Sequence, residues 1–259
     1  MRVKEVLGRY SKDQKLLDPH VHTKSSDGNV AAHQIIEIAV ASNILHAIAI
    51  TDHNTIAPSI EAMEYVQKRG YTLEIISGSE ISTSNGHLLA LFIENDIPRN
   101  KPVEETIREI HRLGGLAIAP HPFFRRIRSL GTDNILDVIH NEDPEIYFDG
   151  FEILNAGVYR LNRKIIEQAK LFYLSYQNRL GAAIGASDNH YYTPGLGLTA
   201  YTQNPKDAIK SRKTSVLVLE ESEIKQIRNI ALDLFPKEIQ PLVRKLDKLR
   251  EQLRNRIAT

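Results

Sequence analysis

The sequence contains no cysteine, which excludes disulfide bonds, zinc–thiolate sites and a cysteine nucleophile. It has no apolar run approaching about 18 residues, and residues 1–15 are polar, so neither a membrane span nor a signal peptide is expected. Lys and Arg total 33 against 32 Asp and Glu, a balance that gives no bulk attraction to nucleic acid or to membranes. We expect a soluble, cytoplasmic protein whose affinity for anions is local.

The chain of 259 residues, 42% hydrophobic, is long enough for one large α/β domain with a sizeable core. Short apolar runs alternate with amphipathic segments, a pattern typical of βα units around a parallel sheet or barrel. The pattern predicts strands over 16–22, 46–51, 73–77, 87–93, 116–119, 150–155, 182–186, 199–202 and 215–220, and helices over 31–43, 59–68, 103–113, 135–140, 161–177 and 205–212. It predicts a domain over 1–220 and a helical extension over 221–259.

Potential metal ligands are densest in residues 18–28, DPHVHTKSSDG. His20 and His22 are two positions apart, so alternation along a strand points both imidazoles to the same face. Neutral imidazole is the commonest protein metal ligand. An isolated pair of this kind is nevertheless more often a surface or partly buried polar pair than a metal site.

Other ligand-type side chains occupy equivalent places along the chain. They lie at or just after the ends of predicted strands: His20, His22, His53, Glu80, His121, Asp188 and His190. In closed α/β barrels this end of the strands carries the active site. His87 differs, because it begins a strand directly after the Asn85-Gly86 turn. If the sheet closes, the sequence predicts that these side chains converge.

These residues occur in motifs that together resemble the polymerase and histidinol phosphatase (PHP) family. The motifs, in order, are His20-x-His22, Ser26-Asp27-Gly28, Ile50 to Thr55 (ITDHNT), Gly78-x-Glu80, Gly86 to Leu89 (GHLL), Pro120-His121-Pro122 and Ser187-Asp188-x-His190. The resemblance covers about residues 16 to 218. It implies a distorted seven-stranded (β/α) barrel holding up to three metals, and it implies phosphoesterase activity.

The resemblance also assigns ligands to metals. His20, His22, Glu80 and Asp188 would hold one ion; Glu80 would bridge to a second ion bound by His87 and His121; and Asp27, His53 and His190 would hold a third. Nitrogen and oxygen ligands without sulfur suit Mn, Zn or Fe better than Mg or Ca. Two or three divalent ions are therefore the expected cofactor.

A metal-bound water would then be the nucleophile for hydrolysis of a phosphate ester, and no protein nucleophile is needed. Asp52 is expected to orient an imidazole rather than to bind metal. Candidate substrate-binding residues are Lys24, Arg125, Arg126, Arg128 and Asn155. The arginine group is equally typical of a solvated loop, and Asn155 of a turn.

The residues after 220 form a different kind of segment. A helical stripe of Leu242, Leu246, Leu249, Leu253 and Ile257 predicts packing on the domain or on a second subunit, rather than a membrane or RNA surface. Packing on a second subunit would make the protein a homo-oligomer. Pro236 and Pro241 are expected to divide this segment into two helices.

Three functions remain open from the sequence. The first is a phosphoesterase acting on a small phosphorylated substrate, a nucleotide or a nucleic-acid end, with histidinol-phosphate phosphatase as an alternative. The second is an amidohydrolase or deacetylase, although no lysine ends a strand where that family needs one. The third is a metal-bound module without catalysis.

Overall fold

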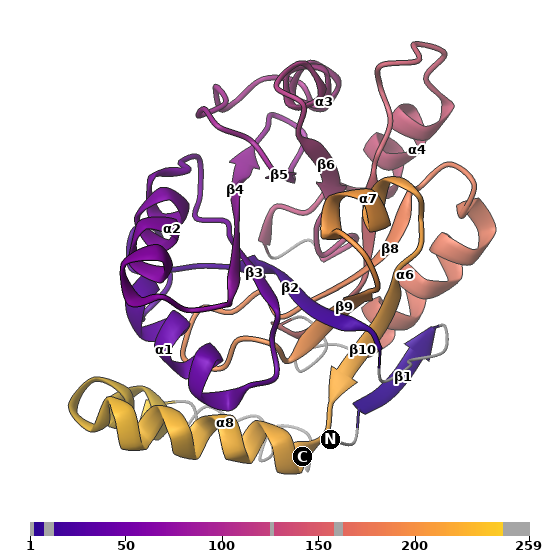
Figure 1. Cartoon of the computed structure of the whole chain (residues 1–259). Coiled ribbons are helices and arrows are strands. Elements are labelled where there is room, and N and C mark those ends of the chain that lie inside the picture. The colour runs from indigo at the N-terminus through magenta and orange to yellow at the C-terminus, as the bar shows by residue number, and fades with distance from the viewer. Residues whose placement is uncertain (1–2, 8–12, 125–126, 158–162, 246–259) are drawn as a thin grey trace.

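The computed structural model describes residues 3–7, 13–124, 127–157 and 163–245 (Figure 1). The described strands are β1 Val3–Leu7, β2 Lys15–Val21, β3 Ala47–Ile50, β4 Glu74–Ser82, β5 His87–Leu91, β6 Leu116–Ala119, β7 Gly150–Asn155, β8 Ala182–Ala186, β9 Gly197–Tyr201 and β10 Ser215–Leu219. They form one sheet in the order β1-β10-β9-β2-β3-β4-β5-β6-β7-β8. The α/β fold is therefore confirmed.

The sheet curls until its far strands meet. Beyond β8, Asn189 forms a parallel bridge with Val21 at the end of β2. The amide of His22 donates to the Asn189 carbonyl at 2.9 Å, and the Asn189 amide donates to the His20 carbonyl at 3.3 Å. These bonds join the first and last parts of the barrel at one rim.

The expected number of seven strands is wrong. All nine strands that the periodicity predicts, β2 to β10, are present in the barrel-like part, and β1 pairs antiparallel with β10 at the edge of the sheet. The count rises because β9 pairs antiparallel with residues 15–17 of β2, and β10, which follows after residues 202–214, pairs antiparallel with β9. The short polar N-terminal segment that forms β1 gave no strand signal.

Strand direction varies around the sheet. Strands β2, β3 and β4 run parallel, as do β6, β7 and β8, whereas β5 is antiparallel to both β4 and β6. The β4–β5 hairpin turns at Gly86, whose φ is 146°, and an added Cβ would lie 2.7 Å from the Leu130 amide nitrogen. In this hairpin Ser82 pairs with His87, so the start of β5 lies at the same rim as the end of β4.

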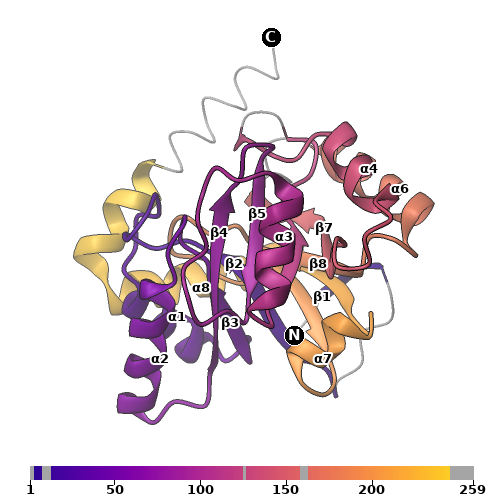
Figure 2. The ribbon, with the colours of Figure 1, turned by 90° about the horizontal axis from the view of Figure 1, so that it is seen from above.

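The described helices lie outside the sheet (Figure 2). They are α1 Ala32–Ser42, α2 Ala57–Arg69, α3 Val103–Arg112, α4 Thr132–His140, α6 Arg163–Tyr176, α7 Pro205–Lys210 and α8 Glu221–Leu234. Each buries apolar side chains on one face; in α1, Ile35 and Ile36 are fully buried. No described helix is long and apolar enough to cross a bilayer.

The C-terminal segment packs on the barrel. Helix α8 begins with a capping box formed by Glu220 and Glu223 and ends before Pro236. A further helical stretch follows over 236–245 and continues through Pro241, which therefore does not divide it. Ile239 and Val243 of that stretch are buried in the same apolar cluster as α1. Of the predicted stripe, Leu246, Leu249, Leu253 and Ile257 lie outside the described residues.

Candidate metal centre

The first group of ligand atoms surrounds one carboxylate oxygen of Glu80. His20 Nε2 and His22 Nε2 lie 3.4 and 3.1 Å from Glu80 Oε2, and 2.9 Å from each other. Asp188 Oδ1 lies 3.5 Å from both imidazole nitrogens. These four side chains come from β2, β4 and the segment after β8, and both imidazoles are fully buried.

The second group uses the other oxygen of Glu80. Glu80 Oε1 lies 2.8 Å from His121 Nε2 and 2.9 Å from His87 Nδ1. Glu80 lies inside β4 rather than after it, because β4 extends to Ser82. Its two oxygens therefore face two different sets of ligands, as a bridging carboxylate requires.

The third group lies nearer to solvent. Asp27 Oδ2 is 3.2 Å from His190 Nε2 and 3.4 Å from His53 Nε2, and 52% of the Asp27 side chain is exposed. His22 joins this group to the first, because its Nδ1 lies 3.4 Å from Asp27 Oδ1. The centre thus runs from a buried end at His20 to an accessible end at Asp27.

Backbone conformation at the rim aims two of these side chains. His121 follows β6 with a φ of 29°, and Asp188 follows β8 with a φ of 50°. Non-glycine residues rarely adopt positive φ, and such residues cluster at functional sites. Each residue follows a short apolar strand with one residue between, so the unusual backbone conformation lies where the strand has just ended.

The carboxylates and imidazoles of the centre shift the pKa values of one another. Burial alone would raise the pKa of the Asp27 carboxyl, but hydrogen bonds from His190 and His53 hold it far below its usual range. Burial alone would lower the pKa of His190, yet its contacts with Asp27 and Asp188 raise it to about 9. The pKa of Glu80 is likewise held well below its normal value, against the effect of burial, by His20 and His121.

The donor set fits divalent ions. His22 Nδ1, His53 Nδ1 and His87 Nδ1 are buried without a hydrogen-bond partner among the described residues. His87 Nδ1 is only 2.9 Å from Glu80 Oε1 but is not aligned to donate to it. Short contacts without hydrogen-bond alignment are what ligand atoms directed at a common ion produce.

Five overlapping sets of three residues have ligand atoms within 4.8 Å of one another. Together these sets contain His20, His22, Asp27, His53, Glu80, His87, His121, Asp188 and His190. The structure therefore brings together every residue that the sequence nominated as a ligand. Whether each one binds metal remains a prediction.

Asp52 supports a loop. Its carboxylate accepts hydrogen bonds from the Thr23 amide at 2.9 Å, from the Thr23 hydroxyl at 2.8 Å and from the Ser26 hydroxyl. These described bonds go to the loop that carries Asp27 rather than to an imidazole, in contrast to the expected role. Asp52 thereby fixes the chain between His22 and Asp27.

Asp18 also supports a segment that carries candidate ligands, in this case the segment after β8. It is fully buried and accepts from the Ser187 amide at 3.0 Å and from the Gly195 amide at 2.6 Å. Burial raises the pKa of this carboxyl to about 6, and the hydrogen bonds oppose that rise. The contacts hold the segment bearing Asp188 and His190 against β2.

Glu152 in β7 is a site residue that the sequence did not nominate. Its side chain is fully buried, with Oε1 2.9 Å from His20 Nδ1. The available signal was a carboxylate inside an otherwise apolar strand, GFEILN, whose burial requires polar partners. Asn155, at the end of the same strand, donates from Nδ2 to Glu152 Oε2 at 2.9 Å and to Asp188 Oδ2 at 3.2 Å.

Of the other candidate substrate-binding residues, two are described by the structure and two are not. Lys24 and Arg128 are exposed, and the Arg128 carbonyl accepts a hydrogen bond from the His87 amide at 2.8 Å. Arg128 therefore belongs to the rim beside the second group of ligands. Arg125 and Arg126 lie outside the described residues.

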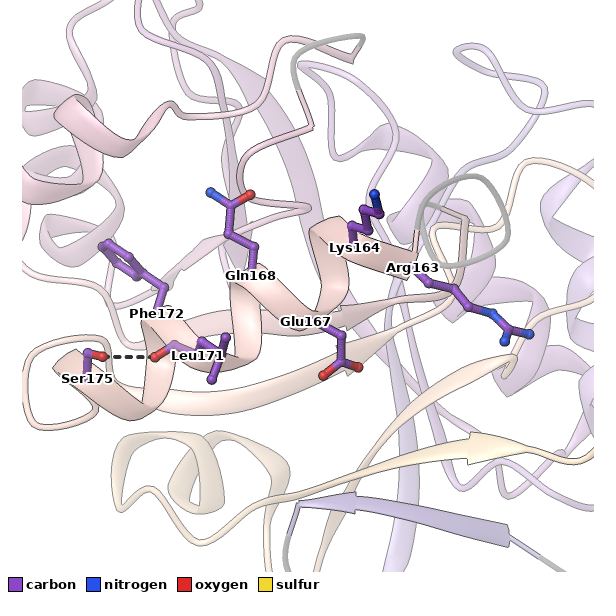
Figure 3. Close-up of a pocket in the computed structure, with 7 residues that line it drawn as sticks. All are labelled: Arg163, Lys164, Glu167, Gln168, Leu171, Phe172 and Ser175. Atoms are coloured by element: carbon purple, nitrogen blue, oxygen red, sulfur yellow. Dashed lines mark hydrogen bonds between the residues drawn. The ribbon is translucent and has the colours of Figure 1, made fainter. Parts of the chain in front are cut away.

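A separate cavity of about 600 Å³ lies along α6 (Figure 3). Its lining is Arg163, Lys164, Glu167, Gln168, Leu171, Phe172 and Ser175, and the Ser175 hydroxyl donates to the Leu171 carbonyl at 3.0 Å. None of the nine candidate metal ligands lines it. The metal centre is therefore not part of this cavity.

Comparison with known proteins agrees with the ordered motifs. The family model described as the PHP domain matches residues 18–192, which include all nine candidate ligands. The chain belongs to the PHP domain family. An uncharacterized protein of Methanocaldococcus jannaschii is 37% identical to this PHP protein over 150 residues, covering 54% of the chain and 81% of the relative.

Other similarities are partial. The 5'-3' exoribonuclease Rnm of Escherichia coli is 38% identical over 68 residues, 26% of this chain and 23% of Rnm. A solved two-domain protein of Bacteroides vulgatus, described as containing a predicted PHP-like metal-dependent phosphoesterase, superimposes with a TM-score of 0.60 at 20% identity, over 88% of this chain and 73% of that one. An amidohydrolase of Chromobacterium violaceum superimposes with a TM-score of 0.52 at 15% identity, over 80% of this chain and 99% of that one. These two structures support the fold.

Proposed function

We propose that this PHP protein is a metal-dependent phosphoesterase that hydrolyses a phosphate ester. The observation that carries the proposal is the position of Glu80, whose two oxygens face two separate imidazole sets within 3.5 Å. Two or three bound Mn, Zn or Fe ions would activate water for attack on phosphorus and neutralise charge on the phosphoryl oxygens.

The buried end of the centre would bind metal, and the exposed end would admit the substrate. The buried end, at His20 and His22, holds its ligands rigidly because these side chains are inaccessible to solvent. The exposed end, at Asp27, leaves room for a substrate to approach. Lys24 and Arg128, exposed on the rim loops, would pair with phosphate oxygens, and Arg guanidinium suits a bidentate contact.

A nucleotide or the end of an oligonucleotide is the substrate class that we favour. The segment similar to Rnm supports this choice, because that relative is a 5'-3' exoribonuclease. The rim segment 123–133 is also short for an enzyme whose substrate is enclosed by a separate domain. A compact single phosphomonoester such as histidinol phosphate is the alternative.

The test is hydrolysis by protein loaded separately with Mn²⁺, Zn²⁺ or Fe²⁺. The panel contains simple phosphomonoesters, nucleotide bisphosphates, histidinol phosphate, short 5'-phosphorylated RNA and acetylated amides. Release of phosphate or nucleotide that disappears in Glu80→Ala and on chelation supports the proposal. Hydrolysis of the amides alone would establish an amidohydrolase, and metal binding without any turnover would establish a non-catalytic module.

A further inference from the structure

One buried carboxylate contacts two of the candidate ligands. Glu152 Oε1 lies 2.9 Å from His20 Nδ1, and Glu152 Oε2 accepts a hydrogen bond from the backbone amide of His121 at 2.6 Å. Both side chains of the Glu152–His20 pair are fully buried. His20 belongs to the first group of ligands and His121 to the second, so Glu152 contacts both.

Asn155 fixes which oxygen of Glu152 faces which donor. Its Nδ2 donates to Glu152 Oε2 at 2.9 Å and to Asp188 Oδ2 at 3.2 Å. The amide cannot rotate by 180° without presenting its carbonyl oxygen to two carboxylates. Glu152 Oε2 therefore faces two N–H donors, and Oε1 faces only the imidazole of His20.

The tautomer of His20 follows from this arrangement. A carboxylate oxygen accepts hydrogen bonds, so His20 presents a protonated Nδ1 to Glu152 Oε1. In the neutral imidazole the lone pair is then on Nε2, the atom that lies beside His22 Nε2 and Glu80 Oε2. A carboxylate behind a ligating imidazole also orients the ring and increases its basicity.

We propose that Glu152 is a positioning residue of the metal centre. It holds His20 in the tautomer whose Nε2 can bind an ion, and it anchors the backbone of His121 in its left-handed conformation at φ 29°. The inference rests on the proposed metal centre and is independent of the substrate. It assigns no contact with the reacting atoms to Glu152.

Glutamine at position 152 provides a directed test. The side-chain oxygen of the glutamine must remain at the Oε2 position, because that position faces the His121 amide and Asn155 Nδ2. The NH₂ group is then directed at His20 Nδ1, which must become the acceptor. The proton moves to Nε2, and His20 can no longer bind metal through that atom.

The experiment is calorimetric titration of metal-free protein with Mn²⁺. Glu152→Gln is expected to lower the affinity of one ion by about 10- to 100-fold. The matched control is Glu223→Gln, which changes another buried glutamate, in the α8 capping box. Its Mn²⁺ affinity should equal that of the wild type. Equal affinities for Glu152→Gln and wild type would overturn the proposal.

A measurement on the wild type keeps the test valid if Glu152→Gln does not fold. In ¹⁵N-resolved imidazole spectra of the Zn²⁺-loaded protein, His20 should carry its proton on Nδ1 and its metal on Nε2. The reverse assignment would refute the positioning role. Absence of metal binding by the wild type would reject the metal centre itself, whereas binding without phosphate-ester hydrolysis would reject only the proposed function.

Discussion

His190 Nε2 lies 3.2 Å from Asp27 Oδ2, although 163 positions separate the two residues in the chain. This contact defines the solvent-exposed group of ligands, which also includes His53. The group contacts the buried ones through His22, Glu80 and Asp188. Because Asp27 itself is exposed, an ion bound by it should be removable without loss of the others.

Asp27→Ala tests that independence. We expect one Mn²⁺ fewer per chain by elemental analysis, with the remaining ions retained, and a fall in phosphate-ester hydrolysis of about 100-fold if this ion takes part. Asp233→Ala, at an exposed position on α8, is the control and should change neither quantity. Unchanged metal content in Asp27→Ala would contradict the assignment of the third group.

Glu80→Gln tests the bridging role. The glutamine keeps the size of the side chain but has only one oxygen acceptor, so it cannot bind two ions. We expect loss of at least one ion per chain and a fall in hydrolysis of at least about 100-fold, because both buried groups share this carboxylate. Metal content and turnover equal to those of the wild type would exclude Glu80 as a bridge.

His111 and Asp149 predict a pH-dependent term in stability far from the metal centre. His111 Nε2 lies 3.0 Å from Asp149 Oδ2, and the two side chains are 14% and 4% exposed. Burial alone would lower the pKa of His111, but hydrogen bonds with Asp149 and the Glu145 carbonyl outweigh it and raise the pKa. The stabilisation is therefore complete below the unfolded pKa of about 6.5 and is lost as pH rises through the folded value.

His111→Phe retains a ring against Tyr147, whose centroid is 4.3 Å from that of His111, but removes the hydrogen bonds. The loss in unfolding free energy should be about 1–2 kcal/mol at pH 5.5 and smaller at pH 9, measured by urea denaturation. A larger loss at pH 9 than at pH 5.5 would show that the sign is wrong.

Replacement of Gly181, which directly precedes β8, by any residue with a Cβ should cause a backbone clash. Its φ is 72°, and an added Cβ would lie 2.2 Å from the carbonyl carbon of Asp149. Gly70 has a similar φ of 66° but no atom within 4 Å of an added Cβ. Gly181→Ala should cost about 2–4 kcal/mol and Gly70→Ala about 1 kcal/mol, so thermal melting should separate them by several degrees. Equal melting temperatures would refute the backbone clash.

The C-terminal stripe predicts a homo-oligomer. Val243 is buried in the apolar cluster of the domain, so the part of the segment around it packs on its own chain and is not available to a second subunit. If Leu249 and Leu253 contact a second subunit, Leu249→Glu combined with Leu253→Glu should halve the mass measured by light scattering. A wild-type mass equal to that of one chain would reject the oligomer.

The sequence nominated the nine candidate ligands because their types occur in short ordered motifs, most of them near the ends of apolar strands, and such motifs are local features. Convergence of the side chains required closure of the sheet, which depends on contacts such as Val21 with Asn189 and could only be assumed. The position of His87 was uncertain from the sequence alone. An antiparallel hairpin brings the beginning of β5 to the rim where β4 ends, and strand direction is not encoded in the apolar pattern.

Supporting residues were harder to predict than ligands. Glu152 was missed because a single carboxylate in a strand carries no motif, and its partners His20 and His121 are 132 and 31 positions away. Asp52 was expected to orient an imidazole, but its described hydrogen bonds go to Thr23 and Ser26. Such roles depend on side-chain direction at close range, which sequence spacing does not determine.

The bridge between Asn189 and Val21 has a consequence for biosynthesis. The ligand-bearing segment after β8 emerges from the ribosome long after β2, so a nascent chain ending before residue 187 has neither Asp188 nor His190. If the nine candidate ligands bind metal together, the complete cluster can form only after residue 190 has been synthesised.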